Sequence, residues 1–241
     1  LGDVYKRQVN EKAAGRVPVI ASGHISDSFE DQVHELTAMT GTGVDAVILI
    51  TNRLAKEEES DEVWLANLQA LLDKLPSQVP LGFYECPYPY KRVLSPKVTR
   101  WCAESGRFFF LKDTCCDIQQ IKEKLDICRD SNLKLYNANT STLLESLRYG
   151  ATGYSGVMAN MQCDLYAWLC AHPQDEKAEE LSQELTICSL IERQLYPVNA
   201  KYYLSLEGLS ITTECRSKRA EDLTPTFRTE VEMLRQITTV S

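Results

Sequence analysis

The segment AVILITNRLAKEEESDEVWLANLQALLDKLPSQVPLGFYE, residues 46–85, decides the fold class of this chain. It opens on the apolar run Ala46–Ile50 and closes on the run Leu81–Glu85, and each run has the length of a β-strand. Between them, Ser60 precedes apolar residues at helical spacing, beginning with Trp64. A strand that is apolar almost throughout is typical of a parallel sheet covered on both faces, and parallel strands need a crossover connection that is usually a helix. The segment therefore predicts a βαβ unit.

The same alternation continues along the chain in both directions. Further strand-like runs lie at Val17–Ala21, Phe108–Lys112, Leu133–Tyr136 and Gly153–Val157, which brings the predicted count to six strands. Helical patterns lie between several of the runs, and residues 177–196 carry Leu181, Leu185, Cys188, Ile191 and Leu195 on one face. We expect an α/β fold whose C-terminal third is mostly helical.

Composition narrows the classes of partner. The chain has 241 residues, of which 44% are hydrophobic, and a net charge of −8, so it offers no general attraction for nucleic acid or for an anionic membrane surface. Its longest apolar runs fall far short of the roughly 20 residues that span a bilayer. Nine irregularly spaced cysteines, without a secretory signal at the start, indicate free thiols in a reducing compartment. We expect a cytoplasmic protein that acts on small molecules.

Two polar side chains stand at the ends of neighbouring predicted strands. Lys112 ends the run that begins at Phe108, and lysine is rarely buried without a reason. Burial would lower the pKa of Lys112, so that neutral amine could attack a carbonyl and form an imine. Tyr84 has the same place on the preceding strand, and its phenol could transfer a proton. The alternatives are that Lys112 reaches solvent or pairs with Asp113, and that Tyr84 is a core or rim residue.

A resemblance to a known family begins at these two strands. Residues 83–87, Phe-Tyr-Glu-Cys-Pro, resemble the Tyr-Asn-x-Pro segment of the dihydrodipicolinate synthase and N-acetylneuraminate lyase family. Residues 111–114, Leu-Lys-Asp-Thr, are similar to its Lys-Glu/Asp-Ser/Thr segment. Residues 150–160 resemble its eighth-strand element and residues 15–21 the run that leads into its third strand. The resemblance extends from about residue 14 to the C-terminus.

The resemblance implies a (β/α)₈ TIM barrel that in this chain lacks its first two strands. Residues 1–8 would be a possible non-native leader, residues 9–160 the barrel with strands three to eight, and residues 161–241 a C-terminal helical extension. It implies a homotetramer or homodimer in which Lys112 condenses with pyruvate or a related 2-oxo acid. Tyr84 would relay protons, and the backbone near Ser155 would lie beside the bound acid.

The chain departs from the family pattern in its substrate-binding segments. The family's Gly-Thr-Thr-Gly-Glu segment, which grips the substrate carboxylate, has no counterpart, and Thr51–Leu54 replaces its Pro-Tyr-Tyr segment. Family members that make dihydrodipicolinate typically carry an arginine two residues after the proline, where this chain has Pro89. Other cations follow predicted strands and could bind a carboxylate or sugar-acid hydroxyls, namely Arg53, Lys91 and Arg92. The alternative for each of them is a solvated surface charge.

These observations predict a class I, lysine-imine aldolase or lyase that acts on carbon–carbon or carbon–oxygen bonds, with a 2-oxo acid and an aldehyde as substrates. The alternatives are a dihydrodipicolinate synthase or dehydratase of the same family and a non-catalytic barrel that binds or regulates. The absence of two strands could leave this chain inactive. A Schiff-base enzyme needs no cofactor, and no nucleotide-binding glycine loop is present. Three isolated histidines form no metal-binding pattern, although His24 could line the mouth of the barrel.

Overall fold

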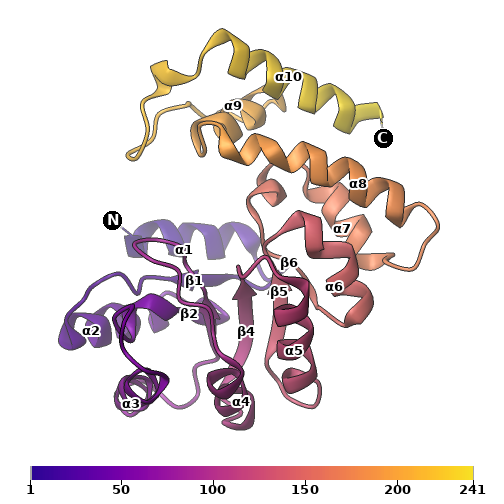
Figure 1. Ribbon diagram of the computed structural model, residues 1–241. Helices are drawn as coiled ribbons and strands as arrows, with labels where there is room; N and C mark the ends of the chain where they lie inside the picture. The colour runs from indigo at the N-terminus through magenta and orange to yellow at the C-terminus, as the bar shows by residue number, and fades with distance from the viewer. Residues whose placement is uncertain (1, 241) are drawn as a thin grey trace. The chain divides into compact units, whose positions relative to one another are not determined.

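A computed structural model describes residues 2–240 of the chain (Figure 1). Its strands follow one another in one sheet in the order of the sequence, and the first four of them pair in parallel. The predicted α/β class and the predicted six strands are confirmed, whereas a closed eight-stranded barrel stays a prediction. The strands are β1 (Ile20–Ser22), β2 (Ala46–Ile50), β3 (Leu81–Tyr84), β4 (Phe108–Asp113), β5 (Lys134–Asn137) and β6 (Gly153–Tyr154).

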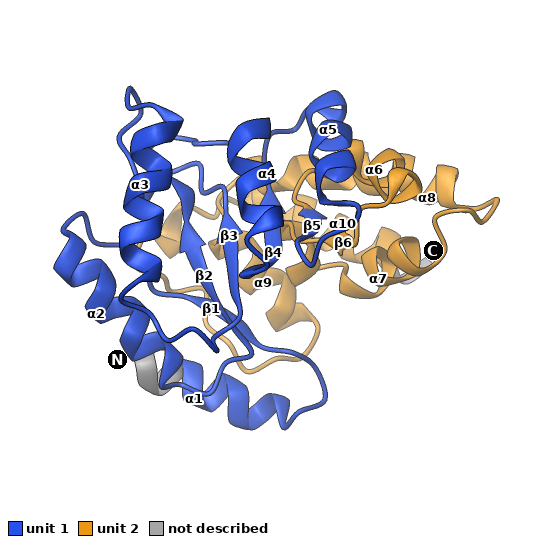
Figure 2. Cartoon of the chain, turned by 90° about the horizontal axis from the view of Figure 1, so that it is seen from below, with its two compact units in different colours: residues 1–136 blue, residues 137–241 orange. Residues whose placement is uncertain are grey.

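The chain divides into two compact units, residues 1–136 and residues 137–241 (Figure 2). In the first unit, Ser28, Ser60 and Ser95 each cap a helix by accepting a hydrogen bond from the backbone N–H three residues later. These short polar caps set where the crossover helices begin. The helices of this unit are α1 (Gly2–Ala13), α2 (Phe29–Thr40), η1 (Thr51–Arg53), α3 (Asp61–Leu72), α4 (Pro96–Glu104) and α5 (Ile118–Cys128).

Aromatic side chains form the core between α3 and the sheet. Trp64 of α3, Phe83 of β3 and Phe108 of β4 are fully buried. The ring centroids of Trp64 and Phe83 are 5.6 Å apart, and those of Phe83 and Phe108 are 4.4 Å apart. The indole N–H of Trp64 donates to the carbonyl oxygen of Thr51 at 2.8 Å, so its polar atom is satisfied inside the core. This packing fixes one face of β3 and β4 against the helices.

The second unit is mostly helical, as the sequence predicts for this region. Its core is built from the apolar faces of these helices, and its fully buried side chains include Leu143, Leu169, Leu185 and Val231. The partition expected at residue 160 stays a prediction. The helices are η2 (Thr140–Thr142), α6 (Leu143–Tyr149), η3 (Val157–Asn160), α7 (Cys163–Ala171), α8 (Ala178–Cys188), η4 (Ser189–Arg193), α9 (Val198–Leu206), η5 (Ala220–Asp222) and α10 (Pro225–Val240).

The helical pattern over residues 177–196 does not form one continuous helix. The α-helix α8 ends at Cys188, and the chain continues as the 3₁₀ turns of η4. Cys188 and Ile191 are three residues apart, a spacing that suits a 3₁₀ turn as well as an α-helix. The apolar pattern alone therefore does not mark the change.

Two expected strands are at least two residues shorter in the structure. The run at residues 17–21 pairs only from Ile20, and the run at residues 153–157 ends as a strand at Tyr154. A Cβ on Gly156 would collide with the hydroxyl group of Tyr154, so the chain at Gly156 passes against that ring. The backbone leaves the sheet here and enters η3.

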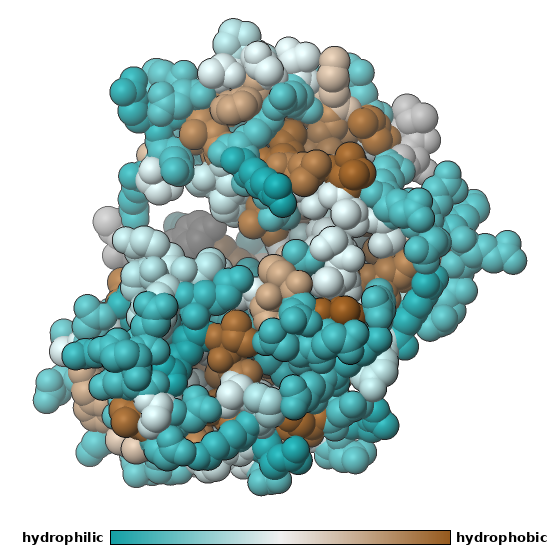
Figure 3. Space-filling view, viewed as in Figure 1, coloured by the Kyte–Doolittle hydropathy of each residue, from teal (hydrophilic) through white to brown (hydrophobic). Residues whose placement is uncertain are grey.

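Hydrophilic residues cover much of the face seen in Figure 3, with hydrophobic residues exposed between them. This agrees with a chain in which 25% of residues are charged. Over residues 2–240, no helix has both the length and the apolar composition needed to cross a membrane. All nine cysteines are free thiols, as expected.

Candidate active site

The ends of β3 and β4 bring Tyr84 and Lys112 together. The two strands are parallel, but Phe109 is an extra residue in β4 that has no partner in β3. Such a bulge shifts the pairing of all later residues by one. Tyr84 therefore lies opposite Lys112, whereas an unbulged pairing would place Leu111 there.

Lys112 and Tyr84 are in direct contact on one face of the sheet. The Nζ atom of Lys112 lies 4.3 Å from the centroid of the Tyr84 ring, and both residues are half-buried. Below them on the same face, a Cβ on Gly82 would come within 2.8 Å of Phe110, so a glycine keeps this position free of side-chain atoms. The ring of Phe110 stacks on Tyr136 of β5 with centroids 4.7 Å apart. The amine and the phenol thus share a confined, largely aromatic face.

A buried ion cluster lies on the opposite face of the same strand ends. Consecutive residues of a strand point to opposite faces, so Glu85 and Asp113 turn away from their neighbours Tyr84 and Lys112. The Nζ atom of Lys124, from α5, lies 2.6 Å from Oε1 of Glu85 and 2.5 Å from Oδ2 of Asp113. All three side chains are almost fully buried. The sequence patterns described above do not predict this cluster, and they suggest Asp113 only as a partner for Lys112.

Signals for this cluster are present in the sequence. Lys124 falls on the stripe of α5 that buries Ile121, Leu125 and Cys128, where an apolar residue is the rule. Glu85 stands where the family pattern quoted above has asparagine. A lysine on a core stripe and a carboxylate in a strand each need a buried partner of opposite charge.

Glu85 bonds through its carboxylate and its carbonyl oxygen to three other parts of the first unit, which are the loop before α4, the loop after β4 and helix α5. Its Oε1 atom accepts from the backbone N–H of Leu94 at 2.9 Å, and its Oε2 atom from that of Thr114 at 2.9 Å. The hydroxyl of Thr114 donates to the carbonyl oxygen of Glu85 at 2.6 Å. Burial raises the pKa of Glu85, while Lys124 acts in the opposite direction. Burial alone would lower the pKa of Lys124, but Glu85 and Asp113 outweigh it and raise that pKa.

The three predicted loop cations make different contacts. Nη1 of Arg53 pairs with Asp27 at 2.5 Å. Arg92 donates to the carbonyl oxygens of Lys56 and Glu59 at 2.8 and 3.0 Å, and so braces the loop that precedes α3. Lys91 is exposed, and its Nζ atom donates to the carbonyl oxygen of Thr114 at 2.8 Å, just beyond the end of β4.

The loop after β3 is held by the segment that replaces the family's tyrosine loop. The side-chain amide of Asn52 donates to the carbonyl oxygens of Cys86, Tyr88 and Tyr90 at 2.9, 2.9 and 2.6 Å. The hydroxyl of Thr51 donates to the carbonyl oxygen of Arg92 at 2.6 Å. These buried bonds give the Tyr84 loop a defined path.

His24 is fully buried, so the expectation that it lines the mouth of a barrel is wrong. Its Nδ1 atom accepts from the backbone N–H of Ile50 at 2.9 Å, and its Nε2 atom lies 2.8 Å from Oε1 of Gln32. The ring therefore donates from Nε2 and is neutral in this arrangement. Burial lowers the pKa of His24 from 6.5 to about 4. The imidazole ties β2 to α2.

Ser155 belongs to the second unit, where it follows β6. Its backbone N–H donates to the carbonyl oxygen of Asn137 at 2.8 Å. Nearby, the hydroxyl of Thr140 lies 2.8 Å from that of Tyr166 and 3.3 Å from that of Tyr154. Burial raises the pKa of Tyr154 to about 12. Ser155 therefore follows a strand end that is rich in hydroxyl groups.

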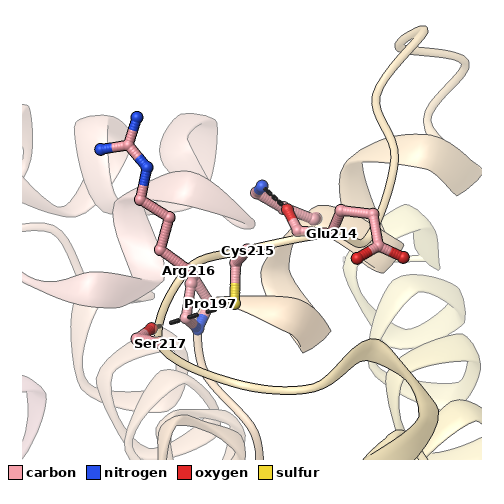
Figure 4. A pocket seen from close by; sticks show the side chains of 6 residues that line it. Pro197, Glu214, Cys215, Arg216 and Ser217 are labelled. Carbon is pink, nitrogen blue, oxygen red and sulfur yellow. Dashed lines mark hydrogen bonds between the residues drawn. The ribbon is translucent and has the colours of Figure 1, made fainter.

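A separate surface pocket of about 630 Å³ lies in the second unit (Figure 4). It is lined by Pro197, Lys201 and residues 214–217, none of which belongs to the expected site. Within the described part of the chain, no three histidine, cysteine, aspartate or glutamate side chains are grouped so that they could hold a metal ion.

The fold is an α/β sheet, and its site is a lysine and a tyrosine in contact at the ends of two neighbouring parallel strands. The sequence profile of the Dihydrodipicolinate synthetase family matches residues 5–234, and the chain belongs to this family.

Curated relatives carry the name 4-hydroxy-tetrahydrodipicolinate synthase. The protein from Thioalkalivibrio sulfidiphilus is 24% identical over 208 residues, which cover 84% of this chain and 68% of the relative. The protein from Thermodesulfovibrio yellowstonii is 27% identical over 146 residues, which cover 61% of this chain and 48% of the relative. The chain thus matches about half to two thirds of the length of these relatives.

Solved structures share the fold. A dihydrodipicolinate synthase of Bacillus anthracis has a TM-score of 0.83 at 22% identity, over 97% of this chain and 79% of that one. The enzyme of Acinetobacter baumannii, solved in complex with pyruvate, has a TM-score of 0.83 at 20% identity, over 99% and 81%. A prophage protein of this family from E. coli K12, also solved with pyruvate, has a TM-score of 0.84 at 16% identity, over 99% and 81%.

The lowered pKa of His24 makes the stability of the protein depend on pH. The unfolded chain takes up a proton at His24 as the pH falls below 6.5, whereas the folded protein resists protonation down to about pH 4. The stabilisation is therefore complete above pH 6.5 and is lost as the pH falls toward 4. We expect His24 to account for a loss of about 2 kcal/mol in the free energy of unfolding between pH 7 and pH 4.5. Urea unfolding at both pH values measures it.

A His24→Gln variant is the matched control, because glutamine keeps hydrogen-bonding atoms but does not titrate. Its free energy of unfolding should fall by about 2 kcal/mol less over the same interval. Equal losses in the two proteins would contradict the assignment.

Proposed function

We propose that the chain carries the imine-forming site of a class I aldolase or lyase that condenses or releases pyruvate or a related 2-oxo acid. The contact between Lys112 and Tyr84 is the observation that carries this proposal, because it joins an amine nucleophile to a proton-transfer group. Membership of the family supports it, as do the pyruvate complexes of the A. baumannii enzyme and the E. coli prophage protein. The resemblance of the two strand segments assigns the same roles.

In the proposed reaction, the neutral Nζ atom of Lys112 attacks the ketone carbon of the 2-oxo acid. The Tyr84 hydroxyl gives its proton to the carbinolamine oxygen, which leaves as water while the nitrogen lone pair forms the C=N bond of a protonated imine. This imine withdraws electrons from the adjacent methyl carbon. The Tyr84 oxygen, as the conjugate base, takes a proton from that carbon and leaves an enamine. The enamine carbon forms a bond to an aldehyde carbonyl carbon, and the Tyr84 hydroxyl returns the proton to the aldehyde oxygen. Water then hydrolyses the imine and frees Lys112, and the reverse sequence cleaves the bond.

The substrate carboxylate needs a separate binding group. We propose that the backbone near Ser155 contacts the 2-oxo acid, as the family resemblance implies. Among the loop cations, Lys91 is the best candidate for a second carboxylate or hydroxyl, because it is exposed and bonded just beyond the strand that carries Lys112. Arg53 is also a candidate, although it pairs with Asp27. Arg92 is the weakest of the three, because its guanidinium braces the loop before α3.

The proposal also covers the substrates, the cellular compartment and the oligomeric state. The substrates would be a 2-oxo acid and an aldehyde, and the enzyme would work in the cytoplasm as a homotetramer or homodimer. A dihydrodipicolinate synthase or dehydratase would use the same imine with a different second substrate, and the curated relatives carry such a name.

Chemical trapping tests the nucleophile. We expect incubation with pyruvate and borohydride to add one reduced pyruvate to the protein, located on Lys112 by peptide mass spectrometry, because reduction fixes the imine as a secondary amine. A Lys112→Met variant should not be labelled, whereas Lys97→Met, which removes an exposed lysine of α4, should be labelled like the wild type. A wild type unlabelled by pyruvate and by a panel of related 2-oxo acids would exclude the imine mechanism.

Isotope exchange tests the proton-transfer role of Tyr84. We expect Tyr84→Phe to keep the borohydride label on Lys112 but to exchange the methyl protons of pyruvate with D₂O about 100-fold more slowly, as loss of an acid–base catalyst predicts. NMR follows the exchange. Tyr88→Phe is the control, because Tyr88 is exposed on the following loop. Exchange at the wild-type rate in Tyr84→Phe would remove Tyr84 from the mechanism.

A further inference from the structure

The ion cluster formed by Glu85, Asp113 and Lys124 lies directly behind the proposed catalytic pair. Tyr84 and Glu85 are consecutive, as are Lys112 and Asp113, and the backbone N–H of Glu85 donates to the carbonyl oxygen of Lys112 at 3.2 Å. Each catalytic side chain thus has a member of the cluster as its neighbour on the other face of the same strand. Any movement of the cluster changes the backbone that carries both catalytic side chains.

The ion pairs and hydrogen bonds of the cluster connect the ends of β3 and β4. Lys124 bridges the two carboxylates, one from the end of β3 and one from the end of β4. Glu85 also accepts the N–H of Thr114, and Asp113 accepts that of Cys115 at 3.0 Å, so each carboxylate holds backbone of the loop that follows β4. A single ammonium group therefore fixes the spacing of the two strands at the point where Tyr84 and Lys112 meet.

The cluster carries one more carboxylate than ammonium groups, two against one. The other titratable groups that the pKa shifts link to it are Cys115 in the loop after β4 and Cys128 of α5. Burial raises the pKa of Cys115 to about 12 and that of Cys128 to about 11, so both thiols stay neutral near neutral pH and add no negative charge to the cluster. With both carboxylates ionised against Lys124, one negative charge is in surplus, and it would favour the ammonium form of Lys112 on the other face of the strand.

We propose that Lys124 is a positioning residue for the Lys112–Tyr84 pair, acting through Glu85 and Asp113, and that the surplus carboxylate of this cluster raises the pH at which Lys112 forms an imine. This inference rests on the proposed function, because it takes imine formation at Lys112 as the reaction that is positioned. A purely structural cluster would stabilise the fold without affecting the rate or the pH dependence of that reaction.

The test measures borohydride trapping of pyruvate over time, at several pyruvate concentrations and pH values, in the full chain. We expect Lys124→Met to lower the rate of labelling at saturating pyruvate by roughly 10-fold or more, with less than about a threefold change in the half-saturating concentration. Leu125→Ala is the matched control, because it shortens the adjacent buried side chain of α5 and destabilises the same core. It should label at nearly the wild-type rate once folded.

Asp113→Asn provides a second measurement that does not depend on the folding of Lys124→Met. It removes the surplus charge and leaves the Glu85–Lys124 pair in place. We expect the pH of half-maximal labelling to move lower by roughly 0.5 to 1 unit, because the ammonium form of Lys112 loses a nearby negative charge.

The outcomes separate this inference from the proposed function. A wild type that is never labelled overturns both. A labelled wild type with an unshifted pH midpoint in Asp113→Asn overturns this inference alone, and so does folded Lys124→Met that labels as fast as Leu125→Ala. Slow labelling by folded Lys124→Met together with the shifted midpoint of Asp113→Asn supports the inference, and where Lys124→Met does not fold, the midpoint of Asp113→Asn alone decides.

Discussion

One extra residue in β4 governs what the rest of the site can do. Phe109 has no partner in β3, and the pairing after it places Lys112, and not Leu111, opposite Tyr84. Because side chains alternate along a strand, the same bulge sends Glu85 and Asp113 to the helical face together. The catalytic face and the ion cluster are therefore two consequences of one register shift. Lys124 of α5 then fixes that register with a buried charge.

Much of the fold follows from the sequence because its strands are continuous apolar runs. Ala46–Ile50 was predicted to the residue, since burial of a strand on both faces leaves no ambiguity about its length. The boundary at Cys188 could not be predicted, because apolar residues three apart fit both an α-helix and a 3₁₀ turn. The short β6 depends on the contact of Gly156 with the Tyr154 ring, which no local pattern encodes.

The candidate site was only partly accessible to sequence reasoning. Lys112 and Tyr84 stood out as polar residues at the ends of apolar runs, and a strand-by-strand reading places them near each other. Their contact depends on the bulge at Phe109. Residues 108–110 are all phenylalanine, so the apolar pattern does not show which of them is the extra residue. Lys124 falls on the buried stripe of α5, but the carboxylates that pair with it come from two strand ends, so the sequence pattern alone does not identify its partners. Arg92 follows a predicted strand, which favours a substrate-binding role. Its guanidinium instead donates to backbone carbonyl oxygens in another loop, and no pattern around Arg92 in the sequence indicates these partners.

The central claim is that the amine of Lys112 forms a covalent bond to a 2-oxo acid beside Tyr84. A crystal structure of the protein grown with pyruvate tests this most directly. We expect continuous electron density from Nζ of Lys112 to the ketone carbon of pyruvate, with the Tyr84 hydroxyl within hydrogen-bond reach of the adduct. Pyruvate bound without a covalent link to Lys112, or bound away from the ends of β3 and β4, would contradict it.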